Sequence, residues 1–244
     1  MLERLAGNDA LKAELGTALR GGRLPHAVLL VGEPGCGAGF AARCLAADYL
    51  YPNGGPHAEA VLRGQDTESI VVRGEGASGQ IKVEAIRDAR QNIQKSALSS
   101  DAEGRVLFIY GAQNLNGASA NAMLKIMEEP PEGVMFLLTA SSAAAVLPTI
   151  RSRCVSFAVA PVSPEQCARY CAAQGVDKKT AALYSELFDG HIGTVLAAAQ
   201  DEARTAQVEK ALQLAKAAAD RDSYAAACLL AAYEKDKAGA AALL

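Results

Sequence analysis

The stretch "AVLLVGEPGCGAGFAARCLAADYL", residues 27–50, decides the fold. Its first five residues, 27–31, are all apolar and indicate a buried strand. A glycine-rich turn follows, and residues 40–50 then predict a helix. A strand, a glycine-rich loop and a helix in this order form the context of a phosphate-binding loop, in which backbone N–H groups and the helix N-terminus face an anion.

The loop has the glycine frame of the motif G-x-x-x-x-G-K-[ST] but lacks its two polar residues. Gly32 and Gly37 occupy the glycine positions, with Gly35 between them, whereas Ala38 and Gly39 replace the lysine and the hydroxyl residue. In a working site the lysine contacts the outer phosphates and the hydroxyl group holds Mg²⁺. Without these contacts, nucleotide affinity should fall by orders of magnitude. The same glycines also fit a plain turn between a strand and a helix, and this interpretation stays open.

The second half of a Mg²⁺–nucleotide site is missing as well. Carboxylates that organise magnesium should follow a buried strand about 70 residues further on. The apolar run at 106–110 ends in Tyr110, followed by Gly111 and Gln113, with no Asp or Glu at its exit. We therefore predict that the chain does not hydrolyse ATP, and we expect no cofactor.

Length and composition indicate a globular protein with one large domain and a smaller one. The chain has 244 residues, half of them hydrophobic, and a formal net charge of −3. This charge gives no general reason to expect direct nucleic-acid binding. No segment approaches the roughly 18 unbroken apolar residues of a membrane span. The N-terminal residues alternate charged with apolar side chains and lack a signal-peptide core, so we expect a cytoplasmic protein without a membrane partner.

The six cysteines form no C-x-x-C pair. Cys167 and Cys171 lie one helical turn apart, but no His or Cys cluster nearby completes a tetrahedral metal site. We predict buried free thiols, with neither a disulfide nor a metal.

Short apolar runs alternate with helical patterns over the first two thirds of the chain. We expect strands at residues 27–31, 69–72, 106–110, 134–139 and 154–159. Strands rich in β-branched residues with helical crossovers imply an α/β fold with a mainly parallel sheet, covered on both faces. The glycines and prolines of residues 51–68 predict irregular structure. From about Ser163 onward only helices are expected. The end at Leu244 suggests a chain cut within a helical region, and a natural short end is the alternative.

Three segments closely resemble subunits of bacterial DNA polymerase III clamp loaders. They are "GRLPHAVLLVGEPGCG" (22–37), "IKVEAIRDARQNIQKSA" (81–97) and "ANAMLKIMEEPPEGVMFLLTASSAAAVLPTIRSRC" (120–154). The third matches the family's run of N-A-L-L-K-x-[ML]-E-E-P-P, a sensor strand, L-P-T-I and S-R-C. The resemblance covers roughly residues 5–200. With the ATP site missing, it points within the gamma/tau and delta-prime group to the delta-prime type.

The resemblance implies an AAA+ architecture. An α/β nucleotide-type domain with a degenerate phosphate loop would span residues 1–161, and a helical lid would span 162–200. Residues 201–244 would begin a helical collar that is incomplete here. Family members of this type act as a fairly rigid stator in a ring of five subunits, which loads the sliding clamp onto primed DNA with ATP bound by neighbouring subunits.

The resemblance also assigns a catalytic role in trans. Arg153, flanked by Ser152 and Cys154, occupies the arginine-finger position, where a guanidinium group reaches the ATP of the adjacent subunit. The implied partners are the gamma/tau and delta subunits and, indirectly, the sliding clamp and primer-template DNA. A surface arginine paired with an acid is the alternative interpretation of Arg153. Arg151 is the weaker finger candidate.

Other positions depart from an active relative. Thr139 occupies the sensor position, and Thr194 replaces the sensing arginine of the lid helix. Glu128 and Glu129 either contribute to a subunit interface or form a solvated helix end. The four cysteines that usually bind zinc in this group are absent from residues 50–66, so no zinc module is expected.

Two other functions stay open on the sequence. The chain could be an independent P-loop enzyme such as a small-molecule kinase, although the lysine and aspartate that it would need are not found. It could also be a decayed AAA+ adaptor that serves a process outside the replisome.

Overall fold

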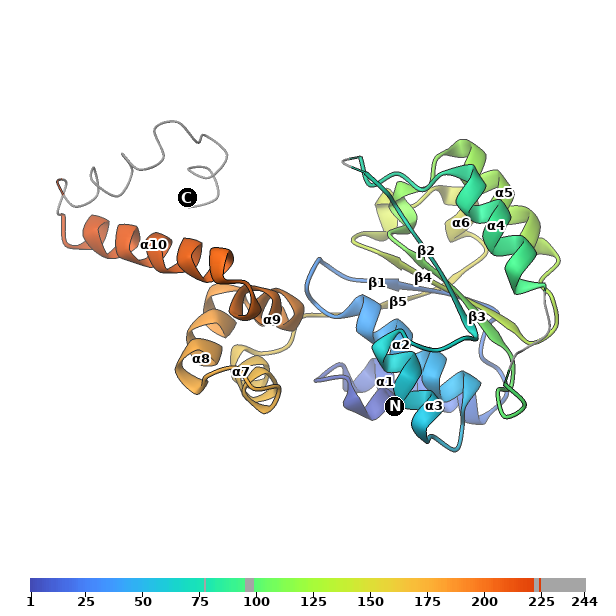
Figure 1. Cartoon of the computed structure of the whole chain (residues 1–244), viewed down its shortest axis with the longest axis horizontal. Helices are drawn as coiled ribbons and strands as arrows, with labels where there is room; N and C mark the ends of the chain where they lie inside the picture. The colour runs from blue at the N-terminus through green and yellow to red at the C-terminus, as the bar shows by residue number, and fades with distance from the viewer. Residues whose placement is uncertain (77, 95–98, 222–223, 225–244) are drawn as a thin grey trace.

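The computed structural model describes residues 1–76, 78–94, 99–221 and 224 (Figure 1). Its strands are β1 (Ala27–Val31), β2 (Ser69–Arg73), β3 (Arg105–Tyr110), β4 (Val134–Ala140) and β5 (Val155–Ala158). Its helices in the first two thirds of the chain are η1 (Leu2–Arg4), α1 (Asp9–Arg20), α2 (Ala38–Leu50), α3 (Pro56–Arg63), α4 (Val83–Ile93), η2 (Ala112–Asn114), α5 (Gly117–Glu128), η3 (Ala143–Ala145) and α6 (Pro148–Arg151). The later helices are α7 (Pro164–Ala173), α8 (Lys178–Leu187), α9 (Ile192–Gln200) and α10 (Glu202–Ala219).

The strands form one parallel sheet in the order β2-β3-β4-β1-β5. The predicted α/β fold with a parallel sheet is thus confirmed. The first and last residues of each predicted strand differ from those of the observed strand by at most one residue. Central strands β1, β3 and β4 are buried along nearly their whole length, which explains why they read as unbroken apolar runs. All strand C-termini share one edge of the sheet, which is where ligands bind in open α/β folds.

Each face of the sheet is covered by its own group of helices (Figure 1). Alternate strand residues such as Leu30 and Phe108 pack with α1, α2 and α3. Their neighbours, such as Leu29 and Ile109, pack with α4, α5 and α6 on the opposite face. The sheet is therefore the middle layer of three, and it fixes the loops at its C-terminal edge.

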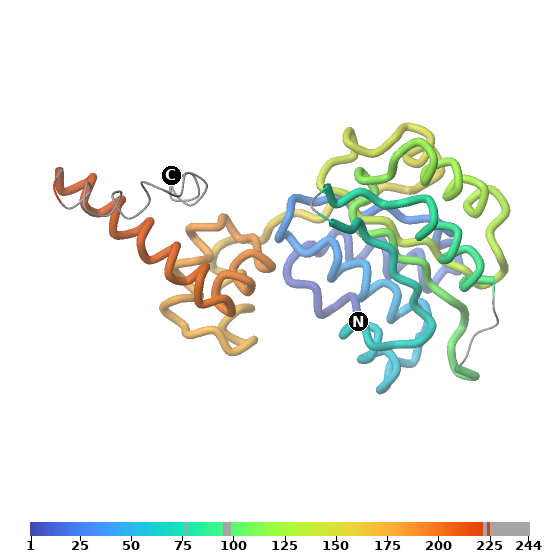
Figure 2. The backbone as a smooth tube through the Cα atoms, turned by 45° about the horizontal axis from the view of Figure 1, so that its top comes forward, coloured from blue at the N-terminus to red at the C-terminus, as the bar shows by residue number. Residues whose placement is uncertain are grey.

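The chain leaves the sheet after β5 and builds a separate helical body (Figure 2). Helices α7, α8 and α9 enclose a small core of their own, with Cys167, Cys171 and Val195 fully buried. Helix α10 then leads away from this body (Figure 1). Half of the expected collar segment 201–244, residues 222–223 and 225–244, lies outside the described residues. None of the described helices combines the length and apolar character needed to cross a membrane.

The prediction of irregular structure for residues 51–68 is wrong for α3. Pro56 begins this helix, where a fixed φ and a missing N–H are harmless, and Gly64 ends it with a left-handed φ of 68°. Ala58, Val61 and Leu62 bury one face of α3 against the rest of the core. Proline and glycine therefore mark the two ends of a short amphipathic helix in this segment.

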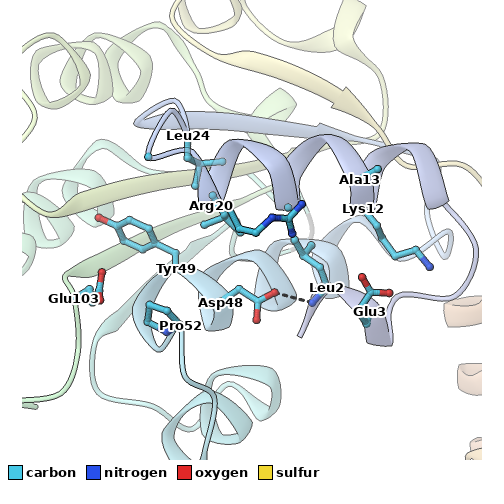
Figure 3. A pocket seen from close by; sticks show the side chains of 13 residues that line it. Leu2, Glu3, Lys12, Ala13, Arg20, Leu24, Asp48, Tyr49, Pro52 and Glu103 are labelled. Carbon is cyan, nitrogen blue, oxygen red and sulfur yellow. Dashed lines mark hydrogen bonds between the residues drawn. The ribbon is translucent and has the colours of Figure 1, made fainter.

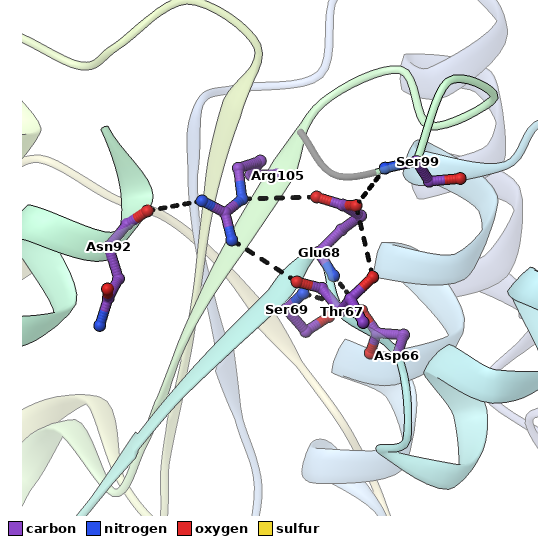
Figure 4. Close-up of polar contacts among 7 residues, drawn as sticks. All are labelled: Asp66, Thr67, Glu68, Ser69, Asn92, Ser99 and Arg105. Carbon is purple, nitrogen blue, oxygen red and sulfur yellow. Dashed lines mark hydrogen bonds and ion pairs between the residues drawn. The ribbon is translucent and has the colours of Figure 1, made fainter. Parts of the chain in front are cut away.

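A buried ion pair joins β2 to β3 at the N-terminal edge of the sheet (Figure 4). Glu68 is fully buried and Arg105 is 8% exposed, and Arg105 Nε lies 3.5 Å from Glu68 Oε2. The guanidinium group also donates to the carbonyl oxygens of Asn92 at 2.5 Å and Thr67 at 3.5 Å. The Glu68 carboxylate accepts the backbone N–H of Ser99 at 2.8 Å. These contacts connect the starts of two strands with the end of α4, far from the loops at the other edge.

Candidate functional site

The glycine loop folds as a turn between β1 and α2. Gly35 and Gly37 have φ values of 91° and 101°, which favour glycine. At Gly32 an added Cβ would lie 2.4 Å from Cys36 Sγ and 2.5 Å from the carbonyl oxygen of Val159. Three of the predicted loop glycines are thus required by backbone geometry, whether or not an anion binds.

Tyr110, at the end of β3, lines the side of the glycine loop that faces this strand. Its ring stacks on Phe108 at 5.6 Å between centroids and lies under the guanidinium of Arg73 at 5.4 Å. Burial raises the pKa of Tyr110, and the nearby Arg43 partly offsets this shift. An added Cβ at Gly39 would lie 3.3 Å from Tyr110 Cε1. An aromatic ring therefore packs against the loop beside Gly39.

Thr139 has a structural contact at the end of β4. It is 8% exposed, and its hydroxyl oxygen accepts the backbone N–H of Gly111 at 3.2 Å. Gly111 has a φ of 80° and begins the turn after β3. Thr139 thus stabilises the turn that carries Gln113, whose Oε1 is buried without a hydrogen-bond partner among the described residues.

A cavity of about 400 Å³ remains beside the loop. Its lining combines the loop residues with Arg43, Tyr110, Gln113 and Ser141. Ala38 and Gly39 line it too, so the predicted loop residues are indeed gathered at one site. Arg43 supplies a cationic group there, but the described lining contains neither a lysine nor an aspartate. The loop residue Glu33 contributes a carboxylate to the same lining.

The start of α9, which belongs to the helical body, contacts the glycine loop. The backbone N–H of Gly193 donates to the carbonyl oxygen of Gly35 at 2.7 Å. His191 Nε2 lies 3.1 Å from Glu33 Oε2, on the same loop. Thr194, at the position of the lid's sensing residue, packs directly over Gly35. The segment that would sense a nucleotide in a relative therefore contacts the loop itself.

The Ser152–Arg153–Cys154 segment forms a turn between α6 and β5. Pro148 begins α6, and the backbone N–H of Arg153 donates to the carbonyl oxygen of Ile150 at 3.1 Å. Ile150 is fully buried, and burial raises the pKa of the Cys154 thiol to about 12. The two apolar anchors, at 150 and 154, hold Arg153 at the surface, where its side chain is 38% exposed.

The guanidinium group of Arg153 has two partners among the described residues. Nη2 donates to Glu128 Oε1 at 2.6 Å, and Nη1 donates to the carbonyl oxygen of Thr149 at 3.3 Å. The pairing of a surface arginine with an acid, the alternative interpretation of this residue, is thus found in the isolated chain. Arg151 instead donates to the carbonyl oxygen of Ala143 at 3.2 Å. Glu129, the C-cap residue directly after α5, has no ion pair in the described part of the chain.

Arg153 and the glycine loop lie at opposite ends of β5. Ala158, at the end of β5, pairs with Val31, which precedes the loop, whereas Arg153 comes before the strand begins. Helix α5 starts after the exit of β3, and its 12 residues advance about 18 Å to Glu128, the partner of Arg153. The arginine therefore belongs to the N-terminal edge of the sheet, away from its own loop.

Another cavity, of about 630 Å³, lies elsewhere, between α1 and the end of α2 (Figure 3). Lys12, Arg20, Asp48 and Glu103 give its wall charges of both signs. The N-terminal amine pairs with Asp48 at its rim. None of the loop, β3 or α6 residues lines this cavity, so its volume has no bearing on the site at the glycine loop.

Known proteins match this chain over most of the sheet region. Residues 7–163 match the family described as "DNA polymerase III, delta subunit". The gamma/tau subunit of Mycobacterium tuberculosis is 31% identical over 182 residues, which is 70% of this chain and 31% of that protein. The delta' subunit of Haemophilus influenzae is 40% identical over 74 residues, 30% of this chain and 22% of that protein. The chain spans less than a third of the length of these curated relatives.

Solved structures confirm the type of fold. The RuvB Holliday junction branch migration motor of Thermotoga maritima superposes with a TM-score of 0.56 at 14% identity. The match covers 96% of this chain and 72% of the RuvB chain. At this identity the likeness concerns the fold alone, an AAA+ P-loop-type sheet followed by a helical part.

Proposed function

This chain belongs to the DNA polymerase III delta-subunit family of clamp-loader AAA+ proteins, and we propose that it is a non-catalytic, delta-prime-like subunit within it. In this role it assembles with gamma/tau and delta subunits into a hetero-oligomeric ring in the cytoplasm. It helps the ring load the sliding clamp onto primer-template DNA. Residues 1–161 form the nucleotide-type domain, 162–200 the lid and 201–244 the beginning of the collar.

The placement of Arg153 is the observation that supports this proposal. A guanidinium group offers a planar fork of donors that suits a phosphate, but this one lies at the edge of the sheet opposite its own loop. A triphosphate that it reaches must therefore be bound by another chain. Arg153 is the finger, and Ser152 and Cys154 complete the turn that positions it.

The exposed ion pair with Glu128 is compatible with this role. Glu128 and Arg153 are 52% and 38% exposed, and such surface pairs contribute only about 0–1 kcal/mol. A γ-phosphate of an adjacent subunit carries more charge and more acceptor oxygens than one carboxylate. The guanidinium group can exchange Glu128 for the phosphate at small cost when the ring assembles.

The degenerate loop supports the non-catalytic half of the proposal. Loss of the lysine and of the hydroxyl residue removes two charge-assisted contacts of about 1.5–3 kcal/mol each, or about 10²–10⁴-fold in affinity. Tyr110 packs against the loop beside Gly39, and the start of α9 contacts it at Gly35. The chain keeps the framework of an ATPase because that framework aims Arg153.

Isothermal titration calorimetry tests whether the chain binds a nucleotide of its own. We expect no saturable heat from Mg·ATP below about 0.1 mM, because two of the strongest phosphate contacts are absent. The gamma/tau subunit, titrated alongside, is the positive control. Micromolar, Mg²⁺-dependent binding by this chain would contradict the proposal and favour an independent P-loop enzyme.

Co-purification tests the assembly. Tagged chain is expected to retain gamma/tau and delta subunits together through a size-exclusion column. A chain that leaves the column alone, while gamma/tau and delta still associate with each other, would favour an adaptor that serves another process.

A further inference from the structure

We propose that the degenerate glycine loop is a docking site for the start of α9, so that a contact within the chain, rather than a bound nucleotide, fixes the helical lid against the sheet. This inference goes beyond the proposed function, and it does not depend on the role of Arg153. The docking contact, as defined here, comprises residues 33–35 of the loop and 191–194 around the start of α9.

Backbone and side chain both contribute to the docking contact. The first N–H groups of a helix have no partner within the helix. Gly193 is the second residue of α9, and its N–H instead donates to Gly35 at 2.7 Å. His191 Nε2 lies within hydrogen-bonding distance of Glu33 Oε2, at 3.1 Å, and His191 Nδ1 lies 2.8 Å from the carbonyl oxygen of Phe188, which orients the ring. The carbonyl oxygen of Gly35 thus takes the place at the N-terminus of α9 that an anion would otherwise take.

Small residues on both sides allow this close approach. An added Cβ at Gly35 would lie 2.0 Å from Thr194 Oγ1, far closer than any real contact. An added Cβ at Gly193 would lie 3.0 Å from the carbonyl oxygen of Gly35. Gly35, in the middle of the phosphate-type loop, therefore makes room for the start of α9. This contact gives Gly35 a role that needs neither the lysine nor a bound phosphate.

Contacts with the rest of the chain also hold the linker between β5 and α7, residues 159–163, in place. Asn8 binds the backbone of Ala160 on both sides, accepting its N–H at 2.9 Å and donating to its carbonyl oxygen at 3.0 Å. Gly190, just before α9, packs so closely on Val162 that an added Cβ would lie 1.7 Å from its carbonyl oxygen. The lid is thus held at its linker and at the loop. Rotation of the lid about the linker would have to break the docking contact.

Amide hydrogen exchange of the full chain tests the docking contact. We expect the Gly193 N–H to be protected although it lies in the first turn of a helix, and we expect Mg·ATP to leave its exchange unchanged. Gly193→Val should clash with Gly35 and speed exchange of the Gly193 region and of linker residues 159–163 by about tenfold, the equivalent of one lost hydrogen bond. Amides in α7 and α8 should keep their protection, which shows that the lid remains folded.

Two milder variants and a control complete the test. Gly193→Ala and His191→Ala should give smaller increases in the same segments, because each weakens one part of the contact. Ala182→Val, on the exposed face of α8, adds similar bulk to the lid and should leave the exchange rates unchanged.

Two results would overturn the proposal. In one, the Gly193 N–H of the wild-type chain exchanges as fast as the N–H of a free helix end. In the other, the Gly193 and His191 variants exchange at the wild-type rates. Protection gained only with Mg·ATP would show that a nucleotide, not the loop, holds the lid. Arg153→Ala should leave all these exchange rates unchanged. Failure of the docking proposal can therefore be told apart from failure of the arginine-finger assignment.

Discussion

Replacing Arg153 with alanine is expected to lower ATP hydrolysis at the neighbouring site that it completes by about 10³-fold or more, the usual effect of removing an arginine finger. The stability of this chain should change by less than about 1 kcal/mol, because the only ion pair lost among the described residues is the exposed one with Glu128. The large effect on hydrolysis and the small effect on folding follow from the same fact, the exposure of the guanidinium group at the sheet edge.

The measurement compares steady-state ATPase and clamp-loading rates of loaders reconstituted with wild-type or variant chain. The total ATPase rate of the loader should fall by the fraction that the affected site contributes to it. Arg153→Lys keeps the charge but loses the planar fork, so it should restore only part of the activity. Arg151→Ala is the matched control, because this exposed arginine lies two residues away and its described hydrogen bond is to the carbonyl oxygen of Ala143. Normal hydrolysis and clamp loading by the Arg153→Ala loader would show that the assignment is wrong.

Replacing Arg105 with alanine should destabilise the chain by about 3–5 kcal/mol, the usual cost of breaking a buried ion pair from one side. Glu68 is fully buried, and its carboxylate would lose the nearby cation (Figure 4). The carbonyl oxygens of Asn92 and Thr67 would lose a donor as well. The starts of β2 and β3 and the end of α4 should therefore loosen together.

Urea unfolding followed by circular dichroism measures this change. Arg63→Ala is the control, because Arg63 is exposed and its described contact is to the carbonyl oxygen of Glu59 in its own helix. The double variant Glu68→Leu with Arg105→Met should recover much of the lost stability, since apolar residues can replace a buried pair. A loss below about 1 kcal/mol for Arg105→Ala would mean that the pair is solvated in the folded chain.

The sequence was sufficient for the centre of the sheet because β1, β3 and β4 are buried on both faces. The runs 106–110 and 134–139 contain apolar residues almost without interruption, and few other structures require this pattern. Helix α3 was missed because Pro56 and Gly64 were read as loop residues, although they mark a helix start and a helix end. The Glu68–Arg105 pair was missed too, since each residue stands just outside an apolar run and nothing local indicates its partner.

The candidate site, like the fold, could be predicted from the sequence only in part. The absence of a lysine at 38 and of a carboxylate after Tyr110 could be read directly from the motif spacing. The contact of Gly193 with Gly35 could not, because it joins positions more than 150 residues apart through backbone atoms that every residue has. The persistence of a glycine frame without its lysine was the available signal. Glu128 was considered for an interface or a solvated helix end, but its pairing with Arg153 depends on how α5 and α6 pack.

The central claim is that this chain contributes a cation to a triphosphate bound by another subunit and binds none itself. An experimental structure of the assembled loader with a non-hydrolysable ATP analogue tests it most directly. We predict that Arg153 has left Glu128 and lies within about 2.7–2.9 Å of the γ-phosphate of the adjacent subunit, with the loop at 32–39 empty of nucleotide. An analogue held by this chain's own loop, or Arg153 still paired with Glu128 and remote from every nucleotide, would contradict the account.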